Sequence, residues 1–104
     1  MRRFPTFLVV YTGTARTAPV VFYQLKTYES YRTLMQFIER HPHWEVTSGW
    51  SKRRFHLYRT ERLKQGLTTP HFCETKQGWL RVPEAHWPLA AAPKEEILFA
   101  PSFS

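Results

Sequence analysis

The sequence contains no aspartate and no asparagine, and its acidic residues are eight glutamates. Two-metal phosphoryl transfer and Ser-His-Asp nucleophilic catalysis depend on aspartate in most of their forms. The glutamates are scattered along the chain and form no compact cluster of the kind that holds magnesium. We therefore expect neither a magnesium-dependent nuclease nor a polymerase.

Cysteine and long apolar runs are also scarce. Cys73 is the single cysteine, so an internal disulfide framework is excluded and a reducing compartment is favoured. No stretch approaches the roughly 20 apolar residues of a membrane span, and the apolar run over residues 7–11 is too short for a signal peptide. We expect a cytoplasmic protein with no membrane partner.

Positive charge is abundant. The 104 residues carry a net charge of +7, with a pI of about 10.0, and arginine outnumbers lysine ten to five. Arginine suits planar recognition of phosphates and carboxylates better than lysine does. The balance favours an anionic partner, with nucleic acid first and an acidic protein surface second. The alternative is a charge that serves solubility alone.

The apolar pattern predicts one α+β domain over residues 1–83. Continuous β-rich runs at residues 7–11 and 20–25 predict a hairpin. A helix follows, with Thr27 as its N-cap. Its apolar residues recur at helical spacing and form one face, which we expect to pack against Val9, Phe22 and Phe55 or their neighbours. The residues of that face are Tyr31, Leu34, Met35 and Ile38.

Short strands are expected after the helix. Residues 44–47 and 54–59 alternate in polarity, and residues 71–75 and 79–82 predict a last hairpin with Gly78 at its turn. The predicted fold is an antiparallel sheet of four to six short strands with one amphipathic helix packed on one face, in the order β-β-α-β-β-(β-β).

Residues 84–104 form a Pro/Ala-rich segment. Four of the eight prolines fall in the last 22 residues, which favours an extended conformation. Large apolar side chains such as Trp87 and Phe99 are too frequent for a solvated tail. We expect the segment to wrap over the domain. The alternative is a docking motif for another protein.

The most concentrated charge lies between Trp50 and Lys64. Residues 52–64 hold six basic side chains and one acid, and so account for +5 of the net charge of +7. If residues 54–59 form a strand, Arg54, His56 and Tyr58 share the face opposite Phe55 and Leu57. Cations beside aromatic rings suit single-stranded nucleic acid, because cations meet phosphates and rings stack on bases. The alternative is an exposed sheet face whose arginines protect an edge strand.

The leading hypothesis is therefore a small non-catalytic module that binds single-stranded DNA or RNA. Its predicted contact residues are Trp50, Lys52, Arg53, Arg54, His56, Tyr58, Arg59, Arg62 and Lys64.

Three other hypotheses remain open. A small basic domain of this kind can inhibit a protein of the nucleic-acid machinery by binding it. A metal-independent ribonuclease would use His56 as acid or base and Arg59 or Arg62 on the phosphate. The pairs His41/His43 and His71/Cys73 have zinc-ligand residue types, but they lack a tight zinc knuckle. We expect no metal and no cofactor.

Overall fold

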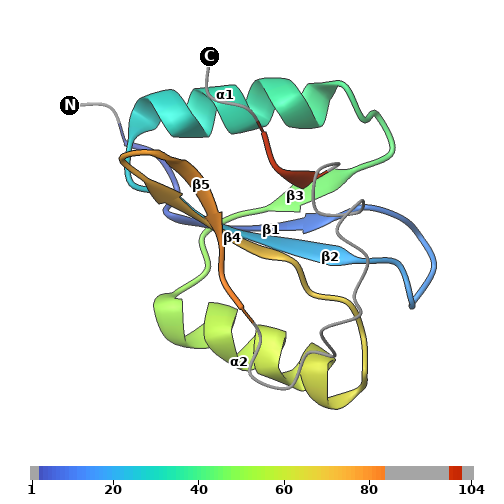
Figure 1. Ribbon diagram of the computed structural model, residues 1–104. Coiled ribbons are helices and arrows are strands. Elements are labelled where there is room, and N and C mark those ends of the chain that lie inside the picture. The colour runs from blue at the N-terminus through green and yellow to red at the C-terminus, as the bar shows by residue number, and fades with distance from the viewer. Residues whose placement is uncertain (1–2, 84–98, 102–104) are drawn as a thin grey trace.

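The computed structural model describes residues 3–83 and 99–101, which form an α+β fold (Figure 1). Five strands and two helices lie within residues 7–81. In chain order the elements are β1 (Phe7–Tyr11), β2 (Val20–Gln24), α1 (Tyr28–Glu39), β3 (Glu45–Thr47), α2 (Lys52–Lys64), β4 (His71–Thr75) and β5 (Gly78–Arg81). Within the described residues, no helix is both long enough and apolar enough to cross a membrane.

The five strands form a single mixed sheet in the order β3-β1-β2-β4-β5. Both predicted hairpins are present, since β1 pairs with β2 and β4 pairs with β5, each antiparallel. β3 also runs antiparallel to β1, but β2 and β4 are parallel. The predicted α+β fold with a sheet of four to six strands is confirmed, but the sheet is mixed because one of its strand pairs is parallel. The chain passes through α1, β3 and α2 between β2 and β4, and a connection of that length allows neighbouring strands to run parallel.

Helix α1 lies where the sequence predicts it. The hydroxyl of Thr27 accepts a hydrogen bond from the N–H of Ser30 (3.2 Å), as an N-cap does. The buried carboxylate of Glu74 on β4 accepts two further hydrogen bonds, from the N–H groups of Lys26 (2.7 Å) and Thr27 (2.8 Å). Glu74 therefore ties the start of α1 to the sheet.

Residues 52–64 form helix α2, so the strand predicted over residues 54–59 is wrong. The Ser51 hydroxyl caps the helix by accepting from the N–H of Arg54 (3.1 Å). The helix ends at Lys64, and Gly66, two residues later, has a φ of 74°, the left-handed conformation that a glycine commonly adopts just after a helix. Phe55 is fully buried and Leu57 is 56% exposed. The prediction that these two side chains share one face is therefore wrong.

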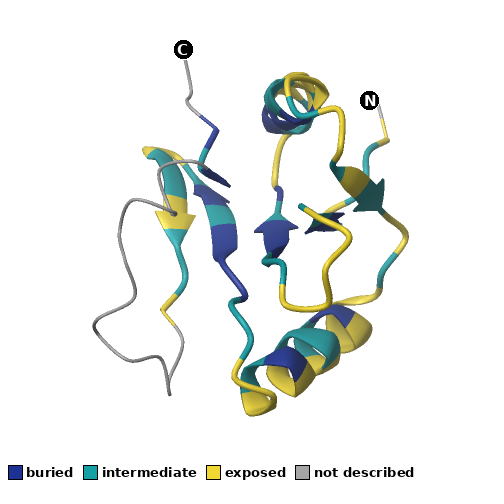
Figure 2. Ribbon diagram, turned by 90° about the vertical axis from the view of Figure 1, so that its right-hand side faces the viewer, coloured by how far each residue is buried: buried dark blue, intermediate teal, exposed yellow. Residues whose placement is uncertain are grey.

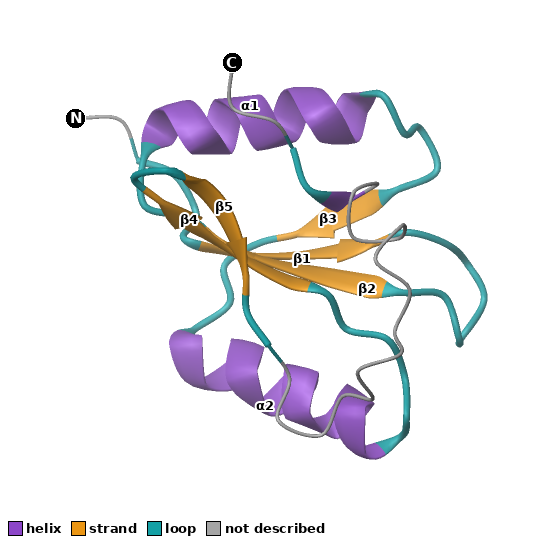
Figure 3. Ribbon diagram, in the orientation of Figure 1, coloured by secondary structure: helices purple, strands orange, loops and turns teal. Residues whose placement is uncertain are grey.

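The two helices cover opposite faces of the sheet (Figure 3), and alternate residues of β1 therefore enter two separate cores. Leu34 and Ile38 of α1 pack on the face that includes Val10. Phe55 of α2 packs on the other face. Val9, Phe22 and Phe55 belong to the α2 side, so α1 packs not against these three residues but against their neighbours in the strands, which the prediction also allowed.

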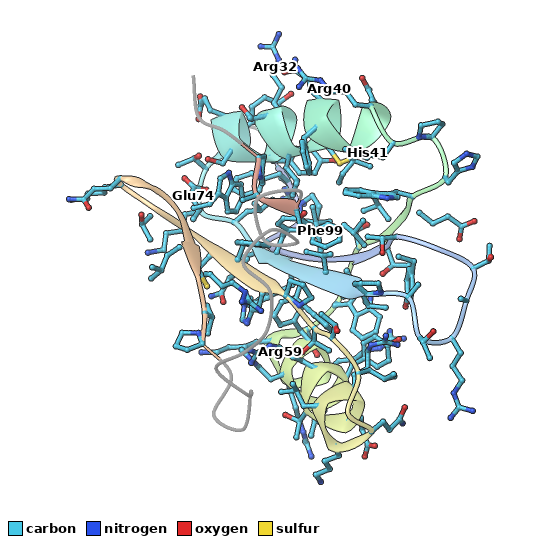
Figure 4. All side chains as sticks on the ribbon, turned by 45° about the vertical axis from the view of Figure 1, so that its right-hand side comes forward. Arg32, Arg40, His41, Arg59, Glu74 and Phe99 are labelled. Atoms are coloured by element: carbon cyan, nitrogen blue, oxygen red, sulfur yellow. The ribbon has the colours of Figure 1, made fainter. Side chains whose placement is uncertain are left out.

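Phe99 returns to the α1 side of the molecule and is buried there. Its carbonyl accepts a hydrogen bond from the Tyr23 hydroxyl (2.6 Å), and its ring centre lies 5.6 Å from that of Trp44. Figure 4 shows Phe99 between α1 and the sheet. The prediction that the segment wraps over the domain falls mainly on residues 84–98, including Trp87, which lie outside the described residues.

Candidate nucleic-acid interface

Trp50, Arg54 and Tyr58 are spaced by four residues and meet along one side of α2. The guanidinium carbon of Arg54 lies 4.0 Å from the centre of the Trp50 ring. The ring centres of Trp50 and Tyr58 are 5.3 Å apart. A cation thus stacks on one ring of an aromatic pair, an arrangement stabilised by the attraction between a cation and the face of a π system.

These side chains line an open groove of about 550 Å³. Its wall on the sheet side comes from Tyr11, at the end of β1, and its other walls come from α2 and its N-cap. The lining residues are Tyr11, Trp50, Ser51, Arg53, Arg54, Leu57, Tyr58 and Glu61. A volume of this order lies within the range of small-molecule sites in proteins.

The sheet fixes the aromatic part of the groove. The indole N–H of Trp50 donates to the Thr47 hydroxyl (2.9 Å), which in turn donates to the carbonyl of Val9 (3.2 Å). The Tyr11 hydroxyl is hydrogen-bonded to Tyr58; burial, and then this bond, raise the pKa of Tyr11 above its ordinary value. Rings held by such bonds lose little further freedom when a ligand stacks on them.

Three exposed cations, Lys52, Arg53 and Arg54, occupy the first turn of α2, and that turn contains no acid. The N-terminus of a helix carries a partial positive charge, so cations there destabilise the helix and an anion is favoured. Figure 2 shows that α2 exposes the side that faces away from the sheet. The first turn therefore presents concentrated positive charge to solvent.

Two of the predicted contact residues point inward. Arg62 is buried, and its Nη2 donates to the carbonyl of Ala18 (3.0 Å), so it ties α2 to the loop between β1 and β2. Arg59 is half-buried on the side of α2 that faces the sheet (Figure 4). A structural role accounts for Arg62 better than phosphate contact does.

His56 also turns away from the groove, toward His71 on β4. The ring centres of the two histidines lie 6.0 Å apart. Burial, followed by the positive charge of Arg59, lowers the pKa of His56 below its ordinary value and that of His71 to about 3. His71 is 1% exposed, so it cannot touch a substrate in this conformation and is not a proton donor at neutral pH.

The two histidine pairs considered as zinc ligands lie apart. His41 follows α1 and stacks on Trp44, with ring centres 3.9 Å apart. His71 lies on β4, where its Nε2 is 3.7 Å from the sulfur of Cys73. Among residues 3–83 and 99–101, no three candidate ligands come together in a way that could hold a metal ion.

The structure thus brings together four of the nine predicted contact residues, namely Trp50, Arg53, Arg54 and Tyr58. Lys52 lies directly before Arg53 in the first turn of α2, and Lys64 is exposed in the last turn. Sequence reasoning missed Tyr11, Ser51, Leu57 and Glu61. The four-residue spacing was a signal for the groove, but nothing in the sequence connects Tyr11 with α2. Comparison of the chain with family models, curated proteins and solved structures gives no significant match.

Proposed function

We propose that the protein binds single-stranded nucleic acid in the groove between Tyr11 and α2. The observation that carries the proposal is the Arg54 guanidinium stacked 4.0 Å from the Trp50 ring centre, next to two further exposed cations in the same helical turn. Stacked rings and cations on one surface match the two components of a nucleotide, its base and its phosphate.

The stacking component comes from Trp50, Tyr58 and the planar face of Arg54. Every base has a π face, so a stacking surface of this kind binds single strands with little dependence on sequence. Duplex DNA keeps its bases stacked inside the helix and does not offer them to a groove. The arrangement therefore favours single-stranded over double-stranded nucleic acid.

The phosphate component comes from Lys52, Arg53 and Arg54. Their position in the first turn lowers the stability of α2, because each repels the positive end of the helix. A phosphate bound there would remove this unfavourable interaction and add charge-assisted hydrogen bonds. An anionic ligand thus explains an arrangement that lowers the stability of the free protein.

The test is direct binding of a fluorescent eight-residue single-stranded RNA, its DNA counterpart and a duplex, at about 50 mM salt. We expect binding of both single strands, with affinity reduced at least fivefold in Trp50→Ala and Arg54→Ala. Arg40→Ala is the matched control, because Arg40 projects from the end of α1 on the opposite side of the sheet (Figure 4). Absence of single-strand binding, or equal losses in Arg54→Ala and Arg40→Ala, would reject the proposal.

An acidic protein surface is the second candidate, and the exposure of Leu57 favours it. This side chain is 56% exposed in the groove wall, and an apolar side chain surrounded by cations suits a protein interface. Leu57→Ser separates the two candidates. It should leave nucleic-acid affinity within about twofold, whereas it should weaken a protein complex built on an apolar contact at the centre of the interface.

A further inference from the structure

Glu61 is the only acidic residue of α2, and it lines the same groove as Arg54 and Tyr58. It follows Arg54 by seven residues, two turns of helix, and Tyr58 by three, so all three project toward the same side. The side chain is exposed. A carboxylate thus stands at one end of a surface otherwise suited to phosphates.

This position of Glu61 is unfavourable in two ways. A carboxylate repels the phosphates that the neighbouring cations attract. Glu61 also begins the last turn of α2, where the negative end of the helix disfavours an acid. Within residues 3–83 and 99–101, this carboxylate makes no ion pair and no capping hydrogen bond that would offset the two effects.

We propose that Glu61 makes the groove selective for guanine, by accepting hydrogen bonds from the Watson–Crick edge of a base stacked on Arg54 and Trp50. This inference rests on the proposed function and adds a base preference to it. An ionised carboxylate only accepts hydrogen bonds, so it selects bases by the donors on their edges. Unpaired bases expose that edge to side chains.

Guanine offers two adjacent donors on this edge, N1–H and the N2 amino group, which together match the two oxygens of a carboxylate. Adenine and cytosine each offer one amino group beside an acceptor. Uracil offers a single N–H between two carbonyl oxygens, and both oxygens repel a carboxylate. The expected order of affinity is guanine first, adenine and cytosine next, and uracil last.

The groove has space for this contact. Its volume of about 550 Å³ is sufficient for a single nucleotide. The Arg54 guanidinium covers the Trp50 ring, so a base stacks on the outer face of that pair or takes the place of Arg54 on the indole. Glu61 then meets the edge of the base, while Arg53 and Lys52 remain near its phosphate.

The test uses four pentanucleotide RNAs, identical except for a central guanine, adenine, cytosine or uracil in a uridine background. The wild-type protein should bind the guanine probe about tenfold more tightly than the uracil probe, as expected of a bidentate base contact at an exposed site. Glu61→Gln should reduce this ratio below about threefold and leave the affinity for the uracil probe equal or tighter. Glu39→Gln, an equal charge change on the exposed side of α1, should preserve the ratio.

The outcomes separate the two proposals. Equal affinity for all four probes in the wild type overturns the guanine preference and leaves single-strand binding intact. A Glu61→Gln variant that tightens every probe by the same factor also overturns it, because Glu61 then contributes only repulsion. A wild-type protein that binds none of the probes overturns the proposed function together with this inference.

Discussion

His71 is a titratable side chain in an apolar environment on β4. It is 1% exposed, and its ring centre lies 5.2 Å from that of Phe55 and 6.5 Å from that of Phe22. Its Nδ1 is buried, and no residue among 3–83 and 99–101 forms a hydrogen bond with it. An unpaired buried nitrogen lowers stability by about 1–3 kcal/mol. Protonating the buried ring would also place a cation beside Arg59. For both reasons His71 stays neutral in the folded protein at neutral pH.

This burial makes the stability of the protein depend on pH. The folded pKa of His71, about 3, lies below the ordinary value of 6.5, so the unfolded chain takes up the proton first as pH falls. The free energy of unfolding should be highest above pH 6.5. Below that, it should fall by up to about 1.4 kcal/mol per pH unit until pH approaches 3. Chemical denaturation at a series of pH values measures this slope.

The histidine effect is best measured between pH 6.5 and 4.5. Burial raises the pKa of Glu74, but hydrogen bonds from Lys26 and Thr27 outweigh this and hold it below its ordinary value. Glu74 therefore contributes stability above its unfolded pKa, and that stability is lost only at lower pH. His71→Phe should flatten most of the slope in the upper window, leaving the part due to His56. His43→Gln, at an exposed position, should keep the slope, and an unchanged slope in His71→Phe would show that the buried ring is not its source.

At the scale of the element, α2 combines a strong cap at each end with a charge pattern that opposes its dipole. We expect Arg53→Glu to raise the free energy of unfolding by roughly 0.3–1 kcal/mol, because it places an acid at the positive end of the helix. The same change should weaken single-strand binding at least tenfold, because a cation of the groove is replaced by an anion. Thermal melting and anisotropy titration measure the two effects.

Lys64→Glu is the matched control for that prediction. It changes the net charge by the same amount, but Lys64 lies in the last turn of α2, outside the groove lining. An acid there meets the negative end of the helix, so stability should fall while binding changes less. If both variants shifted the melting temperature in the same direction, the change in stability would come from the net charge of the protein and not from the position of the charge on the helix.

The elements differ in how far the sequence predicted them. Strands β1 and β2 and helix α1 follow from apolar runs and from the spacing of Leu34 and Ile38, because their buried sides are largely apolar. α2 does not follow from that logic, since Arg62 takes an inward position where an apolar residue is expected and Leu57 faces solvent. Over residues 54–59, the alternation of polar and apolar residues imitates a strand. The caps, Ser51 and Gly66, were the local signal for a helix.

The candidate site was predictable only in part for the same reason. The charge of residues 52–64 located the surface, and Trp50, Arg54 and Tyr58 were named from it. These three side chains meet because they are spaced by four residues along a helix. The strand assigned to residues 54–59 therefore did not predict that they stack. Tyr11 reaches the groove because β1 lies next to β3 in the sheet, a pairing between distant parts of the chain that local patterns do not encode.

At the scale of the whole molecule, the two helical faces differ in charge. The outer side of α1 mixes basic Arg32 and Arg40 with acidic Glu29 and Glu39. Residues 52–64 carry +5 of the net +7, although Arg59 and Arg62 are turned toward the sheet. The accessible charge that remains at the groove is the cluster Lys52, Arg53 and Arg54. A strand of nucleic acid should therefore meet about three cations at once.

That number sets the salt dependence of binding. Each phosphate neutralised on a single strand releases condensed counterions, which gives a slope of about −0.7 per contact in a plot of log affinity against log salt concentration. Three contacts predict a slope of about −2. Arg54→Ala should make the slope shallower by about 0.7, because one contact is lost.

Trp50→Ala should behave differently from Arg54→Ala in the same titrations. A stacked ring contributes roughly 1–3 kcal/mol per base and releases no counterion, so its loss should lower affinity at every salt concentration and leave the slope unchanged. Anisotropy titrations between about 50 and 300 mM salt measure both variants against the wild type. A wild-type slope steeper than about −5 would mean that cations across the whole surface take part, because the groove holds too few to produce it. A slope near zero would mean that no phosphate is bound, and the cluster at the start of α2 would then have to meet its anion on a protein.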